Sequence, residues 1–123
     1  MKAIVDHVRV SQRSRDILLT MKRRTGVEHW NVLCRWAFFD SLANPNKPIS
    51  QSSSPDSNID MSWDVFGGEM TSIIAVVLIQ RAKTDGIKLV KPELAAYFRC
   101  HLERGISQLQ NYNTLTDLCS RVC

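Results

Sequence analysis

Most of the chain's positively charged side chains lie in its first third. Residues 1–35 hold eight Lys/Arg against three Asp/Glu, a surplus of five positive charges, whereas the remaining residues hold eight against nine. A surplus confined to one segment is typical of a surface that faces a polyanion such as nucleic acid. We expect contacts with the phosphate backbone of double-stranded DNA from Arg9, Arg13, Arg15, Lys22, Arg23 and Arg24.

Helix electrostatics offers an alternative explanation for part of this charge. Lys22, Arg23 and Arg24 fall in the last turn of a predicted helix, where cations stabilise the helix dipole without any partner. Arg13 and Arg15 fall near the start of the same helix, where cations are disfavoured. These two arginines therefore favour an external anionic partner.

The histidines and acidic residues form no catalytic pattern that we recognise. His7, His29 and His101 are dispersed, and a structural role is our first interpretation of His101. The sequence has no trusted Ser-His-Asp order, no metalloprotease motif and no phosphate-binding loop. We therefore expect a binding protein without catalytic residues, and no cofactor.

The four cysteines lack the C-x-x-C spacing of common metal and redox sites. Cys34 and Cys100 fall inside helical patterns, where cysteine behaves as a small apolar residue. A zinc site built from Cys119, Cys123 and a histidine remains an alternative, but this spacing is not diagnostic. Our expectation is free thiols and no metal, as in a reducing compartment.

An extended segment and two helices must position the basic residues. Asp6 to Ser11 alternates with period two, which predicts a short strand. Ser11 can cap a following helix that ends at Gly26. With a second helix from about Glu28 to Ala43, residues 7–43 have the layout of a ribbon-helix-helix unit. No other segment is a convincing strand, so this one either pairs with its copy in a second subunit or simply packs on the core.

The second predicted helix is apolar on nearly every side. A helix of this kind is buried all round, which in a small chain implies contact with another subunit. We predict an oligomer interface at Trp30, Leu33, Trp36 and Phe39.

The rest of the chain completes a mainly α fold, a compact bundle of about four to five helices in one domain over residues 1–123. Residues 44–68 are predicted to form a Ser/Pro-rich loop, and residues 69–123 the C-terminal helices, from about Thr71 to Thr84, from Pro92 through Leu109, and a short one over residues 115–122. The longest apolar run, Ile73 to Ile79, is too short to span a bilayer. With no signal peptide recognised, we expect a cytoplasmic location and no membrane partner.

Several motifs resemble the DndE family of DNA phosphorothioation (sulfur modification) proteins. In the first half the similar residues are Arg24-Thr25-Gly26, residues 31–35 (NVLCR) and Ala37-Phe38-Phe39. In the second half they are Gly68-Glu69 before an apolar helix, Asp85-Gly86 after it, and residues 98–106 (FRCHLERGI). The resemblance covers most of the chain, whereas the serine-rich loop and residues 63–65 fit the family's pattern less well.

The resemblance implies a compact helical homotetramer that binds DNA through basic surfaces and prefers nicked duplex. It also implies sibling components that place sulfur in the DNA backbone, and it supplies no catalytic residues. Two other functions remain open. A ribbon-helix-helix transcriptional regulator would read bases through His7 and Arg9, and a scaffold would organise sibling components without touching DNA.

Overall fold

The computed structural model describes residues 3–49 and 57–112. Five α-helices, one 3₁₀ turn and a two-stranded sheet make up this part of the chain, so the predicted mainly α fold with a short N-terminal extended segment is confirmed. In chain order the elements are β1 (His7–Arg9), α1 (Gln12–Thr25), α2 (Trp30–Ala43), β2 (Asp60–Ser62), α3 (Trp63–Gly67), η1 (Gly68–Met70), α4 (Thr71–Thr84) and α5 (Lys91–Leu109). The short helix predicted over residues 115–122 and the cysteines at positions 119 and 123 lie outside the described residues.

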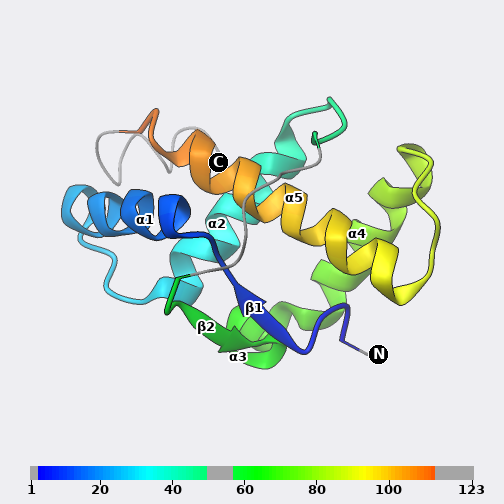
Figure 1. The fold of residues 1–123 in the computed structure, drawn as a ribbon, viewed down its shortest axis with the longest axis horizontal. Helices are drawn as coiled ribbons and strands as arrows, with labels where there is room; N and C mark the ends of the chain where they lie inside the picture. Colours follow the sequence, from blue (N-terminus) through cyan, green and yellow to red (C-terminus); the bar gives the residue numbers. More distant parts are fainter. Residues whose placement is uncertain (1–2, 50–56, 113–123) are drawn as a thin grey trace.

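The crossing of α2 and α5 forms the centre of the molecule (Figure 1). The two backbones come so close at Gly105 that a Cβ atom there would lie 1.8 Å from the carbonyl oxygen of Ala37. Glycine is therefore required at this position by space. Beside the crossing, the rings of Phe38, Phe66 and Phe98 pack on one another with centroids 5.2–6.1 Å apart.

Helix α1 is fixed at both ends by signals that the sequence predicts. Ser11 caps its start, where the Ser11 hydroxyl accepts the Ser14 N–H at 3.1 Å. Gly26 ends it with φ of 75°, in the left-handed region that glycine adopts most easily. A buried carboxylate on α5 adds a long-range tie, because Glu103 accepts hydrogen bonds from the Ser11 N–H (3.2 Å) and the Ser14 hydroxyl (2.5 Å).

The first strand pairs inside its own chain, so the expectation that no other segment forms a strand is wrong, and β1 needs no second subunit as its pairing partner. β1 is antiparallel to β2, with His7 opposite Ser62 and Arg9 opposite Asp60. Residues 59–63 (IDMSW) alternate between apolar and polar side chains, so β2 carries a short period-two signal that the prediction of a loop over residues 44–68 missed. The alternative in which Val8 and Val10 pack on the core is confirmed, because both side chains are buried.

The boundaries of the other elements agree with the sequence in most places. α4 spans Thr71–Thr84 as predicted, whereas α2 begins at Trp30 rather than at Glu28. The predicted loop over residues 44–68 contains β2 and α3 in its last part. Ser62 caps α3 by accepting the Val65 N–H at 3.1 Å.

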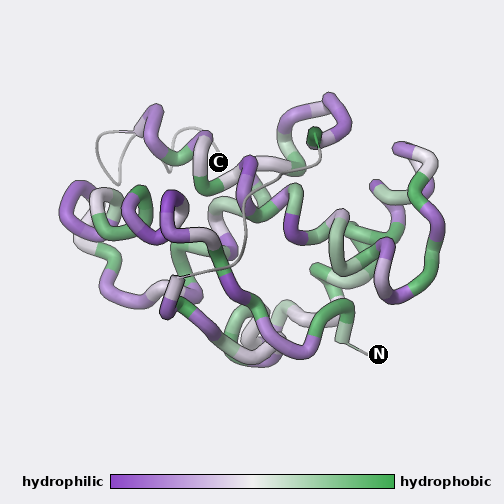
Figure 2. The backbone as a smooth tube through the Cα atoms, viewed as in Figure 1, coloured by the Kyte–Doolittle hydropathy of each residue, from purple (hydrophilic) through white to green (hydrophobic). Residues whose placement is uncertain are grey.

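The stretch Trp63–Thr84 is apolar and long enough to cross a membrane by length and composition alone, and a third of its most apolar 18-residue window is buried. It is not one straight helix, because Gly68 has φ of 55° between α3 and α4. The fourteen residues of α4 span only about 21 Å, which is less than the roughly 30 Å of a bilayer core. Figure 2 shows hydrophobic residues recurring along α4 and hydrophilic ones along α1.

Candidate nucleic-acid interface

Helix α1 lies along one side of the molecule (Figure 1), and its residues Arg13, Arg23 and Arg24 are exposed. Its inner side packs on the core through Leu18 and Met21, both fully buried. The remaining sides carry the cations, and the structure divides the six predicted DNA-contacting residues into groups with different surroundings.

Arg9 on β1 is paired across the sheet with Asp60. Its guanidinium donates to the Asp60 carboxylate at 2.9 Å, and the His7 ring lies 3.4 Å from the same group. The hydrogen bond from Arg9 is the main cause of the lowered pKa of Asp60, with the charges of Arg9 and His7 contributing as well. A base-reading role for His7 and Arg9 would have to break this cross-strand arrangement.

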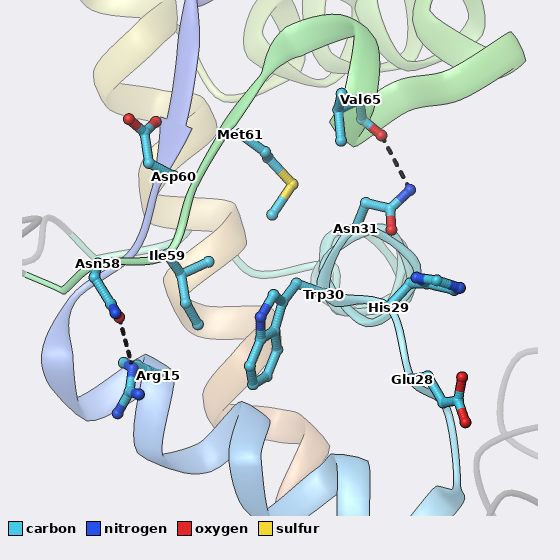
Figure 3. A pocket seen from close by; sticks show the side chains of 10 residues that line it. All are labelled: Arg15, Glu28, His29, Trp30, Asn31, Asn58, Ile59, Asp60, Met61 and Val65. Carbon is cyan, nitrogen blue, oxygen red and sulfur yellow. Dashed lines mark hydrogen bonds between the residues drawn. The ribbon is translucent and has the colours of Figure 1, made fainter.

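Arg15 lies on the side of α1 that faces the start of β2 (Figure 3), and Lys22 lies against Trp30 at the start of α2. The Nε of Arg15 donates to the side-chain oxygen of Asn58 at 2.8 Å, and the Lys22 ammonium lies 4.3 Å from the centroid of the Trp30 ring. Arg15 and Trp30 also line a pocket of about 380 Å³ at the start of α2. Both cations therefore already have intrachain partners, and both are partly buried.

Arg24 caps the end of α5. Its Nη1 donates to the carbonyl oxygens of Gln110 (3.1 Å) and Tyr112 (3.3 Å). These carbonyls follow the last helical turn, where cations are favoured. The Tyr112 hydroxyl in turn donates to the buried Asp40 carboxylate at 2.8 Å. Arg24 thus has a structural task that joins two elements far apart in sequence.

Arg13 and Arg23 are exposed and form no hydrogen bond or ion pair within the part of the chain that the structure describes. Arg13 shares an open groove of about 540 Å³ with Arg24 and Gln110. Arg23 lines a neighbouring depression of about 500 Å³, and Asp16 and Thr20 border both. Arg13, Arg23 and Arg24 therefore share one side of α1, and two of them are free to bind an anion.

The structure also reveals a buried polar cluster that the sequence did not indicate. The Ser41 hydroxyl accepts from the Nε of Arg104 at 2.8 Å, and its oxygen lies 2.8 Å from Nδ1 of His101. Since Ser41 already accepts from Arg104, its own proton is available to Nδ1 of a neutral imidazole. Burial lowers the pKa of His101 to about 4, and the positive charges of Arg104 and Arg81 act in the same direction. Ser41 and His101 are both fully buried.

Two arginines in this cluster hold the segment that follows α2. Arg104 donates to the carbonyl oxygens of Ser41 and Asn46, and Arg81 donates to those of Leu42, Asn44 and Asn46. The C-terminal carbonyls of a helix need such donors. Because the two guanidiniums bind four carbonyls between Ser41 and Asn46, we assign the cluster a structural role, as expected for His101.

The predicted oligomer-interface residues separate into core and surface. Leu33 is fully buried in its own chain, where it belongs to the core. Trp30, Trp36 and Phe39 are partly exposed. The all-round apolar pattern of α2 could not show which side faces the core, because both sides look alike in sequence.

An open groove of about 590 Å³ lies between α2 and the turn before α4. Its lining residues are Val32, Arg35, Trp36, Phe39 and Met70. From Met70, an exposed stripe continues along α4 through Ile73 and Val76, which are 56% and 53% exposed and lie at helical spacing. We call the groove and this stripe together the α2–α4 apolar face.

Metal and thiol chemistry find little support among residues 3–49 and 57–112. No group of three or more His, Cys, Asp or Glu that could hold a metal ion occurs there. Burial raises the pKa of the Cys34 thiol to about 12, with a smaller contribution from the charge of Glu103. Cys34 is therefore a packed, protonated thiol. The alternative zinc site used Cys119 and Cys123, which lie outside the described residues.

Fold and surface together define a small helical protein that presents a basic helix on one side and an apolar groove on another. The family model described as "DNA sulphur modification protein DndE" matches residues 7–117, and the chain belongs to the DndE family. The family resemblance of the sequence motifs is thereby confirmed.

Two solved structures share the fold. The crystal structure of DndE from Escherichia coli B7A, described as involved in DNA phosphorothioation modification, is 24% identical with a TM-score of 0.70, covering 85% of this chain and 96% of that one. The DndE G21/24K mutant is 21% identical with a TM-score of 0.69, covering 88% and 99%. A comparison with curated proteins found no match.

Proposed function

We propose that this chain is an accessory DNA-binding subunit of a DNA phosphorothioation system, working in the cytoplasm as a homotetramer beside the other sulfur-modification components. The observation that carries the DNA-binding proposal is the pair of unpartnered, exposed arginines on α1, Arg13 and Arg23. They lie in the segment that holds the chain's surplus of positive charge.

Phosphate, rather than the base edges, is the proposed target of this surface. Exposed arginines on the outer side of a helix bind phosphate oxygens with charge-assisted hydrogen bonds, which position a protein but carry no sequence information. Arg15, Lys22 and Arg24 add positive potential beside Arg13 and Arg23 without giving up their intrachain partners. Arg9 remains half exposed and contributes in the same way.

Oligomerisation would extend this surface. The α2–α4 apolar face is the proposed contact between copies, with Trp36 and Phe39 as its anchors and Trp30 at its edge. Large apolar side chains that stay exposed together are typical of protein–protein contacts. A preference for nicked duplex would follow if binding bends the DNA, because a nick makes bending easier.

The proposed role requires no catalytic residue. Ser41 and His101 have the side-chain types of a nucleophile and a base, yet both are sealed in the core, and Ser41 is held by Arg104. A substrate could reach neither of them in this conformation. We therefore propose that the chemistry of sulfur insertion belongs to the sibling components.

The test is duplex binding by the isolated protein at moderate salt, measured by fluorescence anisotropy. The variant Arg13→Glu/Arg23→Glu should bind at least about tenfold more weakly, since each lost phosphate contact weakens sequence-independent affinity. Lys83→Glu/Lys88→Glu is the matched control, because it changes net charge equally at two exposed lysines on the α4 side of the molecule. Equal losses in both variants would contradict a localised site.

A scaffold without DNA contact is the second candidate, and the α2–α4 apolar face is the observation that favours it. The same experiment separates the two, because a pure scaffold should give no anisotropy change with any duplex. Sequence-specific regulation is less well supported, since β1 pairs with β2 in the same chain and Arg9 is held by Asp60. A regulator would show strong competition by one sequence over random duplex.

A further inference from the structure

The apolar groove between α2 and α4 contains one charged residue, Arg35. Its side chain is partly buried, and it has no hydrogen-bond or ion-pair partner within the described part of the chain. This contrasts with Arg81 and Arg104, which each bind several carbonyl oxygens. We propose that Arg35 of one copy forms an ion pair with Glu69 of a second copy across this groove.

Gly68 leaves room for the Arg35 guanidinium beside the backbone. A Cβ atom on Gly68 would lie 3.0 Å from Nη1 of Arg35. The φ of 55° and ψ of −130° at Gly68 are also unfavourable for residues with a side chain. The backbone of η1 therefore passes directly beside the guanidinium, and Glu69 is the next residue along this turn.

A partner that covers the groove must supply an acceptor for Arg35. Closing an apolar surface over a guanidinium removes its water, and an uncompensated buried charge is strongly unfavourable. The planar guanidinium matches a carboxylate with two parallel hydrogen bonds. A purely apolar occupant is therefore excluded, and a carboxylate beside an apolar contact fits best.

Glu69 is a carboxylate that lies between Gly68, which adjoins the Arg35 guanidinium, and Met70, which lines the groove. It is exposed, it has no partner among the described residues, and it adjoins Met70, which lines the groove. In a two-fold symmetric contact the same patch of both copies faces itself. If Arg35 of the first copy meets Glu69 of the second, Glu69 of the first copy therefore meets Arg35 of the second. A patch that holds a cation and an anion, neither with a partner among the described residues, offers each copy the opposite charge to the one it needs. Two symmetric Arg35–Glu69 pairs would flank the apolar contact of Trp36 and Phe39.

This inference rests on the proposed self-association, and a charge-swap experiment tests it. Arg35→Glu and Glu69→Arg should each raise the dissociation constant of the contact by at least about 30-fold, because each places like charges opposite one another. The double variant Arg35→Glu/Glu69→Arg should recover most of the wild-type association. Sedimentation equilibrium gives the mass and the dissociation constant, and circular dichroism shows that each variant is folded.

The outcomes separate this proposal from the broader one. If the wild type associates and the single variants keep its dissociation constant, or the double variant stays as weak as the singles, the Arg35–Glu69 pair is wrong and the self-association stands. If the wild type is a monomer at all concentrations tested, both the pair and the proposed oligomer are wrong. Lys88→Glu, an exposed position in the turn after α4 and outside the α2–α4 apolar face, should leave the association unchanged.

Discussion

Acidification should destabilise this protein through the imidazole of His101. The side chain is fully buried, its Nδ1 lies against the Ser41 hydroxyl, and its Nε2 has no hydrogen-bond partner among the described residues. Arg104 and Arg81 face the cluster with positive charge, and only Asp85 opposes them. The fold therefore holds His101 neutral, whereas the unfolded chain lets it take up a proton.

The pKa values set the size and sign of the effect. The pKa is about 4 in the folded protein and about 6.5 in the unfolded chain. Between these values the unfolded state binds more protons, so the stability contribution is complete above about pH 6.5 and is lost as the pH falls toward 4. The full loss is about 3.4 kcal/mol, and about 2 kcal/mol of it has occurred at pH 5.

Urea unfolding at a series of pH values from 8 to 5 measures this loss. The control is His101→Gln, whose amide can still accept from Ser41 but does not titrate. Wild type should lose about 2 kcal/mol more free energy of unfolding than the variant over this range. Equal losses in the two proteins would refute the reasoning, because the pH dependence would then come from other groups.

Three further predictions concern packing and capping. Gly105→Ala should lower the free energy of unfolding by about 3 kcal/mol, because its Cβ would strike the Ala37 backbone. Gly26→Ala has open space around the new Cβ but a φ of 75°, so it should lower the free energy of unfolding by only about 1–2 kcal/mol. Thermal unfolding measures both losses, and a larger loss for Gly26→Ala would contradict the close crossing of α2 and α5. Cys34 should resist alkylation at pH 8 in the folded protein and react in denaturant. Mass spectrometry of the peptide that contains Cys34 measures the labelling, and full labelling of the folded protein would contradict a buried thiol. Arg24→Ala should destabilise the end of α5 by about 1–2 kcal/mol. Amide hydrogen exchange at the end of α5 should then become faster, and an unchanged exchange rate would show that the Arg24 hydrogen bonds do not stabilise this helix end.

Local signals in the sequence predicted much of the fold. Ser11 and Gly26 marked the ends of α1, and the apolar run after Thr71 marked α4, because caps and periodicity depend only on neighbouring residues. The family, too, was recognisable from short motifs around Arg35 and Gly68-Glu69.

The partners of the basic residues could not be predicted in this way. Arg9 pairs with a carboxylate 51 positions later, and Arg24 binds carbonyls 86 and 88 positions later. Such contacts depend on how the helices are assembled rather than on local pattern. The same reason explains Leu33 and Trp36, which share one apolar helix yet lie in the core and in a surface groove.

The most direct test of the proposed function is the salt dependence of duplex binding. A plot of log affinity against log salt concentration has a slope of about −0.9 for each phosphate that the protein neutralises. For wild type we predict a steep negative slope, and for Arg13→Glu/Arg23→Glu a slope shallower by about 2 or more. An identical slope in the two proteins, or no binding by wild type at low salt, would contradict the assignment of a phosphate-binding surface to α1.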